Sequence, residues 1–199
     1  MNRVALPFLI VFTLVAVGCA HSYVAAPPRQ AAVGPGPAAD AFAALSSPRG
    51  PDRFAQVTPL LYRGAQPNAE QLAMLRDVGV KTIVTFITDK SVLRDEIAAA
   101  QKLGLTVHSY PFYGMSSPDP ALLERIVDEL RAADAPVYVH CRQGRDRTSL
   151  VVALFRVWVQ GWNPKTAWQH EALDFGHGGL RTIFFRRLDS AYVRLTQKS

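Results

Sequence analysis

The sequence contains few cysteines: two in 199 residues, Cys19 and Cys141. A small fold held together by several disulfides is therefore excluded. The chain also lacks an internal repeat with a period of about 20 to 50 residues, which excludes solenoids and propellers. Its hydrophobic content of 49% is enough for the core of one folded domain.

Long hydrophobic runs are also missing, because no apolar stretch reaches the roughly 20 residues of a membrane-spanning helix. The longest run, Val4 to Val17, follows Arg3 and is interrupted only by Pro7 and Thr13. A short positive segment followed by an apolar run of about 14 residues is typical of a secretory signal. Residues 1–18 are therefore predicted to be a signal peptide that directs export.

The end of this run resembles the lipobox of bacterial lipoproteins, since small residues precede Cys19, with Ala16 where leucine is usual. This favours a lipid anchor on Cys19 and membrane attachment over an ordinary cleaved signal. Ala20 stands where inner-membrane lipoproteins have aspartate, so the resemblance implies the periplasmic face of the outer membrane. The folded domain would then hold one thiol, Cys141. A lone thiol in an oxidising compartment favours a chemical role.

Residues 19–51 are predicted to be a flexible tether. The stretch is rich in alanine and proline, with Pro27-Pro28 and the segment Gly34 to Pro37, and it has few large apolar residues and little charge. Residues 52–199 are predicted to form the folded domain.

Strands and helices alternate along the predicted domain. Strands are expected at 54–57, 60–62, 80–87, 105–110 and 136–140. Helices are expected to begin at the capping box of Asn68 and Gln71, at Ser91, at Ser117 before Pro118, near Ser149, at Asn163 and at Leu180. This alternation predicts an α/β fold: a three-layer domain with a mostly parallel central sheet flanked by helices.

One loop carries the pattern of a phosphate site, in the segment His140-Cys141-Arg142-Gln143-Gly144-Arg145-Asp146-Arg147-Thr148. The spacing from Cys141 to Arg147 is weak evidence alone, because 17 residues of the chain are arginine. The context is more specific. An apolar strand precedes the cysteine, Gly144 permits a tight turn, and a buried helix is expected to follow Thr148.

The residue types in this loop suit phosphoryl transfer. Backbone N–H groups from Arg142 to Thr148 can converge on one phosphate at a helix N-terminus, which also favours the thiolate of Cys141 as nucleophile. The fork of Arg147 can bind two phosphate oxygens. Thr148 can donate its hydroxyl to the sulfur, and His140 can organise the loop.

These residues resemble the protein tyrosine phosphatase superfamily, specifically its small bacterial dual-specificity-like members. The resemblance spans about residues 53–162 and includes Leu61 to Pro67 as an entry motif, while Ser149 stands where the family usually has glycine. It implies hydrolysis of phosphate monoesters through a cysteinyl-phosphate intermediate. No cofactor is expected, and no metal either, because His108, His170 and His177 do not have the spacing of metal ligands.

The general acid is the open part of the site. The resemblance implies an aspartate about 30 residues before the cysteine, yet residues 109–114 contain no acid. Asp119, at the edge of that loop, is one candidate. Its alternative role is that of a negative charge in the first turn of a helix. Asp146 is the other candidate. Gly144 to Thr148 is similar to the loop of myotubularin lipid phosphatases, where a loop aspartate is a candidate acid. The alternative role of Asp146 is an ion pair with Arg145 or a neighbour.

The net charge of +6 leaves +4 for the predicted domain, with Arg142 and Arg145 beside the loop. Such charge suits a phosphoinositide or an inositol polyphosphate, although a solvated basic face explains the last helix as well. A weakly catalytic phosphate-binding module and a rhodanese-like sulfurtransferase remain as alternatives, the second disfavoured by Arg147 and Thr148. No nucleic-acid partner is expected.

Overall fold

The computed structural model describes residues 45–197. Their centre is a five-stranded sheet in the order β1-β2-β5-β3-β4. The strands are β1 (Ala55–Thr58), β2 (Leu61–Ala65), β3 (Thr82–Thr85), β4 (Thr106–Ser109) and β5 (Val137–Cys141). All pairings are parallel except that of β1 with β2. The prediction of an α/β fold with a mostly parallel sheet is confirmed.

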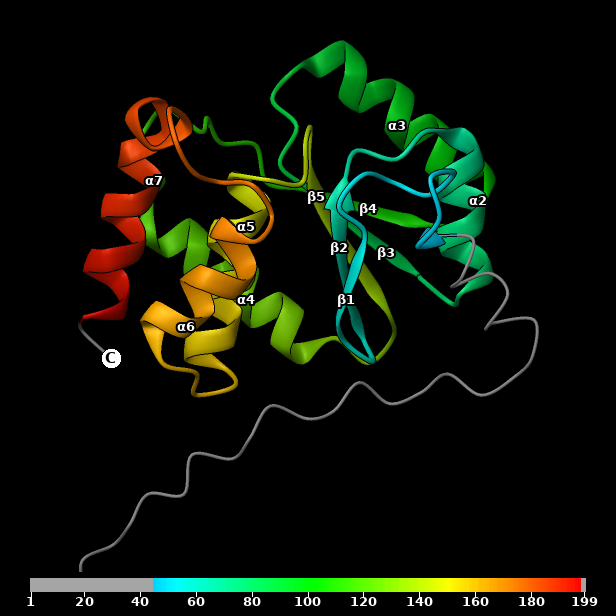
Figure 1. Cartoon of the computed structure of the whole chain (residues 1–199). Coiled ribbons are helices and arrows are strands. Elements are labelled where there is room, and N and C mark those ends of the chain that lie inside the picture. The colour runs from blue at the N-terminus through cyan, green and yellow to red at the C-terminus, as the bar shows by residue number, and fades with distance from the viewer. Residues whose placement is uncertain (1–44, 198–199) are drawn as a thin grey trace, which may run out of the picture.

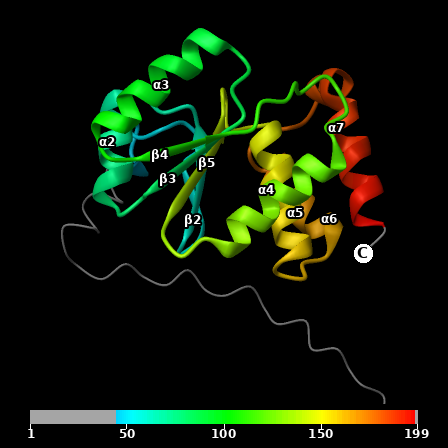
Figure 2. The same cartoon turned by 180° about the vertical axis from the view of Figure 1, so that it is seen from behind.

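Helices cover both faces of the sheet, so the fold has three layers (Figures 1 and 2). On one face lie α2 (Ala69–Asp77) and α3 (Lys90–Lys102). On the other face lie α4 (Pro120–Ala132), α5 (Arg147–Trp158), α6 (Pro164–Trp168), the π-helix η1 (Gln169–Leu173) and α7 (Arg181–Thr196). Among the described residues, no helix is both long and apolar enough to cross a bilayer.

Each face of the sheet has its own hydrophobic core, because successive side chains of a strand point to opposite faces. Val137, Val139 and Cys141 of β5 belong to the core under α4, α5 and α7, whereas Tyr138 belongs to the core under α2 and α3. Helix α5 lies in the middle of the first core, and every residue from Thr148 to Phe155 is buried. This accounts for its nearly continuous apolar sequence.

Two helices begin elsewhere than expected. The N-cap of α3 is Asp89, whose Oδ1 accepts the N–H groups of Ser91 and Val92 over 2.9 and 3.2 Å, so Ser91 is not the cap. The N-cap of α4 is Asp119, with Pro120 in the first turn, and not Ser117. In both cases an aspartate reaches a free N–H of the first turn. The capping box of Asn68 and Gln71 is confirmed.

The segment just before β1 is packed against the domain. Leu45 is fully buried and lies in the core with Tyr62, Leu72 and Tyr138. Folded structure therefore extends at least to Leu45, and the predicted tether over 19–51 is too long at its C-terminal end. The predicted signal peptide and Cys19 lie outside the described residues.

Candidate active site

The phosphate loop lies at the carboxyl ends of the central parallel strands. Cys141 is the last residue of β5, which pairs with β2 on one side and β3 on the other, and α5 begins at Arg147. In α/β sheets, ligand sites form at this edge. A cavity of about 200 Å³ opens there, lined by Tyr113, Gly114, Met115, Cys141, Arg142, Gln143, Asp146, Arg147, Arg181 and Phe185.

Cys141 lies at the cavity wall with 2% of its surface exposed, and it is the one cysteine among the described residues. Burial raises the pKa of its thiol. The charge of Arg147, the Thr148 side chain and the backbone N–H groups of Thr148 and Gln143 outweigh this effect and hold the pKa below its ordinary value. The Thr148 side chain is thus one of the groups that favour the thiolate, and its buried hydroxyl has no hydrogen-bond partner among the described residues. The site therefore stabilises a thiolate.

The guanidinium of Arg147 is held by two backbone carbonyls. Its Nη1 donates to the oxygen of Phe86, just after β3, and to that of Phe112 over 3.2 Å. Among the described residues, its other two nitrogens have no protein acceptor within hydrogen-bond distance. Because a guanidinium is planar, fixing one nitrogen orients the remaining edge. That edge is the pair of donors that binds two oxygens of a phosphate.

The loop turns tightly at Gly144, whose φ is +64°. A Cβ there would lie 2.4 Å from the carbonyl carbon of Gly64 in β2, so any side chain would push the loop away from the sheet. Glycine is required here for both backbone conformation and space.

Arg63 of β2 braces the same turn from inside the domain. Its side chain is fully buried, and Nη2 donates to the carbonyl of Gly144 over 3.0 Å and to the Ser149 hydroxyl over 2.9 Å. Its Nη1 pairs with Glu171 of η1 over 2.6 Å, and the guanidinium stacks on Phe175 at 3.6 Å. Ser149, where the resembling family has glycine, is thus an acceptor for Arg63.

His140 faces the opposite side of the sheet from Cys141, as strand alternation requires. Its Nε2 donates to Glu96 of α3 over 2.9 Å, and its Nδ1 lies 3.3 Å from the carbonyl oxygen of Cys141. The other oxygen of Glu96 accepts from Gln66 over 2.7 Å. The buried pair of His140 and Glu96 therefore holds the backbone of Cys141 from the face of the sheet opposite to the cavity.

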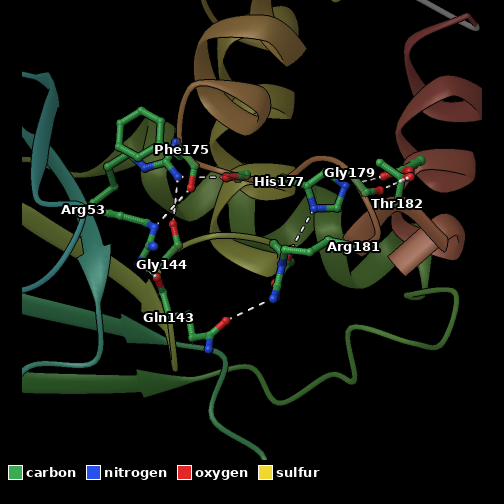
Figure 3. A network of polar contacts seen from close by, with 12 residues as sticks. Arg53, Gln143, Gly144, Phe175, His177, Gly179, Arg181 and Thr182 are labelled. Atoms are coloured by element: carbon green, nitrogen blue, oxygen red, sulfur yellow. Dashed lines mark hydrogen bonds and ion pairs between the residues drawn. The ribbon is translucent and has the colours of Figure 1, made fainter. Parts of the chain in front are cut away.

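Asp146 is held by ion pairs with His177 and Arg181, two residues that Figure 3 labels beside the phosphate loop. Its Oδ1 accepts from Nδ1 of His177 over 2.8 Å and from Nε of Arg181 over 3.1 Å, and its Oδ2 pairs with the same guanidinium. Burial raises the pKa of Asp146, but the hydrogen bonds and charges of His177 and Arg181 outweigh it and lower the pKa. An ionised carboxylate cannot donate a proton, so this geometry favours the ion-pair role.

Asp119, the other candidate acid, accepts the N–H of Ala121 over 3.0 Å as the cap of α4. This is the helix-terminal role that competed with the catalytic one. The residues lining the cavity do not include Asp119.

Arginines gather around the mouth of the cavity. Arg53 donates to the Gln143 carbonyl over 3.2 Å, and Arg181 donates to the Gln143 side chain over 3.1 Å (Figure 3). Burial and then the nearby positive charges of Arg53 and Arg181 lower the pKa of Arg145. Arg142 is exposed on the same loop. The mouth is therefore strongly electropositive.

Several partners of the loop were not foreseen from the sequence. A weak signal exists for Glu96, a charged residue four positions before Ala100 on the buried face of α3. Arg63 likewise stands in a strand whose residues are all buried. His177 and Glu171 have no local signal, because they meet residues far away in the chain. Within residues 45–197, no group of three or more metal-ligating side chains is arranged around a common point.

Known proteins are similar to this chain in sequence. The dual specificity protein phosphatase TpbA of Pseudomonas aeruginosa is 36% identical over 141 residues, which cover 70% of this chain and 60% of TpbA. An inositol diphosphatase of Oryza sativa subsp. japonica is 26% identical over 131 residues, covering 63% of this chain and 62% of the relative. The chain thus spans less than two thirds of these relatives.

Solved structures agree. The crystal structure of P. aeruginosa TpbA in complex with pTyr superposes with a TM-score of 0.59 at 30% identity, covering 73% of this chain and 88% of that one. A putative phosphatase from Shewanella putrefaciens shares the fold with a TM-score of 0.62 at 18% identity, covering 75% of this chain and 95% of that one. Residues 59–161 match the family model described as "Polymorphic toxin system, DSP-PTPase phosphatase", and the chain belongs to this family.

Proposed function

We propose that this protein is a cysteine-dependent phosphatase that hydrolyses phosphate monoesters of the phosphotyrosine and dual-specificity type. One observation carries the proposal: a buried cysteine with a lowered thiol pKa lines the same cavity as an arginine fixed by two carbonyls. A nucleophile and a preorganised phosphate clamp are the two parts that phosphoryl transfer needs.

In the first step, the thiolate of Cys141 attacks phosphorus, an S–P bond forms, and the P–O bond to the leaving group breaks. Arg147 binds two non-bridging oxygens as their charge redistributes, and the N–H groups of the loop at the start of α5 supply further donors. The leaving oxygen takes a proton from an acid or from solvent.

In the second step, water attacks phosphorus and the S–P bond breaks. Inorganic phosphate leaves, and the thiolate is restored. Thr148 assists because its side chain favours the anionic sulfur, which makes Cys141 a better leaving group. The acid of the first step stays a prediction between Asp146 and Asp119.

Aryl phosphates fit the cavity mouth, where Tyr113, Met115 and Phe185 add apolar surface beside the phosphate loop. The relative TpbA is named a dual specificity protein phosphatase and was solved with pTyr. A second candidate substrate class is the inositol phosphates and phosphoinositides. It is favoured by the guanidinium groups of Arg53, Arg145 and Arg181 and by relatives named inositol diphosphatases.

Hydrolysis of p-nitrophenyl phosphate tests the reaction. Wild type should turn over and Cys141→Ser should be inert, with inorganic phosphate still bound by both. If wild type and Cys141→Ser are equally inert, the phosphatase proposal fails, and retained phosphate binding would then indicate a binding module. A panel of phosphopeptides, phosphoinositides and inositol phosphates separates the two substrate classes by kcat/KM.

We also propose that the protein is exported and anchored by acylation of Cys19 at the periplasmic face of the outer membrane. The support is the apolar run from Val4 to Val17 and the small residues before the cysteine. Mass spectrometry of the mature N-terminus tests this, because an unacylated terminus contradicts the anchor.

A further inference from the structure

The most exposed large apolar side chains gather in two short segments. Among the described residues, five such side chains have more than 60% of their surface exposed: Tyr113 (67%), Met115 (65%), Leu180 (76%), Ile183 (64%) and Phe184 (63%). The next most exposed is Val193, at 47%. We call these five residues the apolar rim. Exposed apolar side chains gathered in one place mark interaction sites, whereas scattered ones do not.

The two segments lie side by side at the mouth of the catalytic cavity. A Cβ on Gly114 would lie 2.6 Å from the ring of Phe185, so the loop before α4 touches the N-terminal part of α7. Figures 1 and 2 show the same loop beside this end of α7 in both views. Tyr113 and Met115 line the cavity directly, whereas Leu180, Ile183 and Phe184 do not. The rim therefore extends beyond what one phosphoryl group and its carrier atom would contact.

Within the two segments that carry the rim, all charged side chains are positive. From Leu180 to Leu188 the chain carries Arg181, Arg186 and Arg187 and no acidic residue, and residues 113–117 are uncharged. Arg186 and Arg187 are exposed next to Ile183 and Phe184. Exposed apolar side chains interleaved with arginines are the composition of segments that insert into the interface of anionic bilayers.

We propose that the apolar rim is a docking surface for an anionic lipid bilayer. The five side chains would enter the interfacial region, and the exposed Arg186 and Arg187 would contact lipid phosphates. In this orientation the catalytic cavity opens toward the headgroups. The substrate would then be a phosphate monoester carried at the lipid surface. That last step rests on the proposed phosphatase activity, whereas the docking does not.

Amide hydrogen exchange of the full-length Cys141→Ser protein tests the docking. The probes are vesicles of equal parts phosphatidylglycerol and phosphatidylcholine, and vesicles of phosphatidylcholine alone. The anionic vesicles are expected to slow exchange about fivefold or more in residues 112–116 and 180–187. Equal exchange with both kinds of vesicle in these two segments would overturn the proposal.

Two variants identify the side chains responsible. The double change Ile183→Asn and Phe184→Asn is expected to abolish the protection, whereas Val193→Asn, on the same helix and 47% exposed, should retain it. In a Cys141 background, all of these proteins should hydrolyse p-nitrophenyl phosphate as wild type does, which verifies folding. Protection that survives the double change would contradict the proposal.

A phosphopeptide with apolar residues around the phosphotyrosine is the competing occupant. If that peptide protects both segments and the anionic vesicles do not, the rim binds protein substrates and membrane docking is wrong. If the wild-type protein does not hydrolyse p-nitrophenyl phosphate, the proposed function is contradicted. The exchange experiment with vesicles would still show whether the apolar rim docks on a bilayer.

Discussion

His177 donates Nδ1–H to the carboxylate of Asp146 over 2.8 Å, directly behind the phosphate loop. Its other ring nitrogen donates to Asp189 of α7 over 2.7 Å, and the imidazole is fully buried. Burial lowers the pKa of His177, but the two carboxylates outweigh it and raise the pKa to about 9. A charged imidazole thus connects the last helix of the fold to the loop that holds the nucleophile.

The first prediction is a loss of stability at alkaline pH that depends on His177. Because the folded-state pKa is raised, the protonated imidazole stabilises the fold fully below its ordinary value of 6.5, and this contribution disappears as pH rises through about 9. The loss should be on the order of 3 kcal/mol. Urea unfolding at several pH values measures it. His177→Gln should remove most of this pH dependence. If the free energy of unfolding of the variant changes with pH as that of wild type does, the ion pairs of His177 are contradicted.

The thiolate of Cys141 gives the second prediction. Its lowered pKa means that alkylation by iodoacetamide should reach half its maximum rate below the pH expected of an ordinary thiol. Thr148→Val removes one group that lowers this pKa, so the midpoint should move upward. Mass spectrometry of alkylated protein over a pH series provides both midpoints. Identical midpoints would show that the Thr148 side chain does not contact the sulfur.

Arg147 gives the third prediction. Arg147→Lys keeps the positive charge but loses the planar fork that two carbonyls orient. The value of kcat/KM for p-nitrophenyl phosphate should fall by about a hundredfold or more, mostly in kcat, because the clamp acts on charge that develops in the transition state. A change confined to KM would show that Arg147 serves ground-state binding alone.

The fourth prediction concerns Asp146→Asn, which distinguishes a role as general acid from a role as ion-pair partner. If Asp146 only holds His177 and Arg181, the loss of activity should be similar for p-nitrophenyl phosphate and for an alkyl phosphate, because the proton on the leaving group is not involved. The ion pairs of the network predict this outcome. A loss that grows steeply with the pKa of the leaving alcohol would assign Asp146 as the general acid.

The sequence was sufficient for the parts of the site that are local in the chain. Strand, loop and helix follow each other from Val137 to Trp158, so the glycine turn and the apolar helix could be recognised in order. The partners that hold the loop could not. Arg63 meets Glu171 across 108 positions and His140 meets Glu96 across 44, and only the folded sheet brings them together.

Helix starts show a related limit. At both α3 and α4 a serine and an aspartate stand two positions apart, and either side chain can cap a helix. Which of them does so depends on where the chain leaves the preceding loop, and that is fixed by tertiary packing. For Asp119 this matters to the active site, because the carboxylate that caps α4 is the one that was predicted as a candidate general acid.

Glu171 gives the fifth prediction, because one buried carboxylate neutralises two arginines. Its Oε2 pairs with Arg63 over 2.6 Å and its Oε1 with Arg156 over 2.7 Å. Glu171→Gln keeps the shape but leaves two guanidinium groups without a counter-charge, so the free energy of unfolding should fall by about 3 kcal/mol. Asp174→Asn, at an exposed pair just after the π-helix, is the matched control and should change stability by less than about 0.5 kcal/mol. Because Arg63 also holds Gly144, the Glu171 variant should bind inorganic phosphate more weakly under conditions where it remains folded. Unchanged phosphate affinity would show that the loop keeps its shape without the buried ion pair.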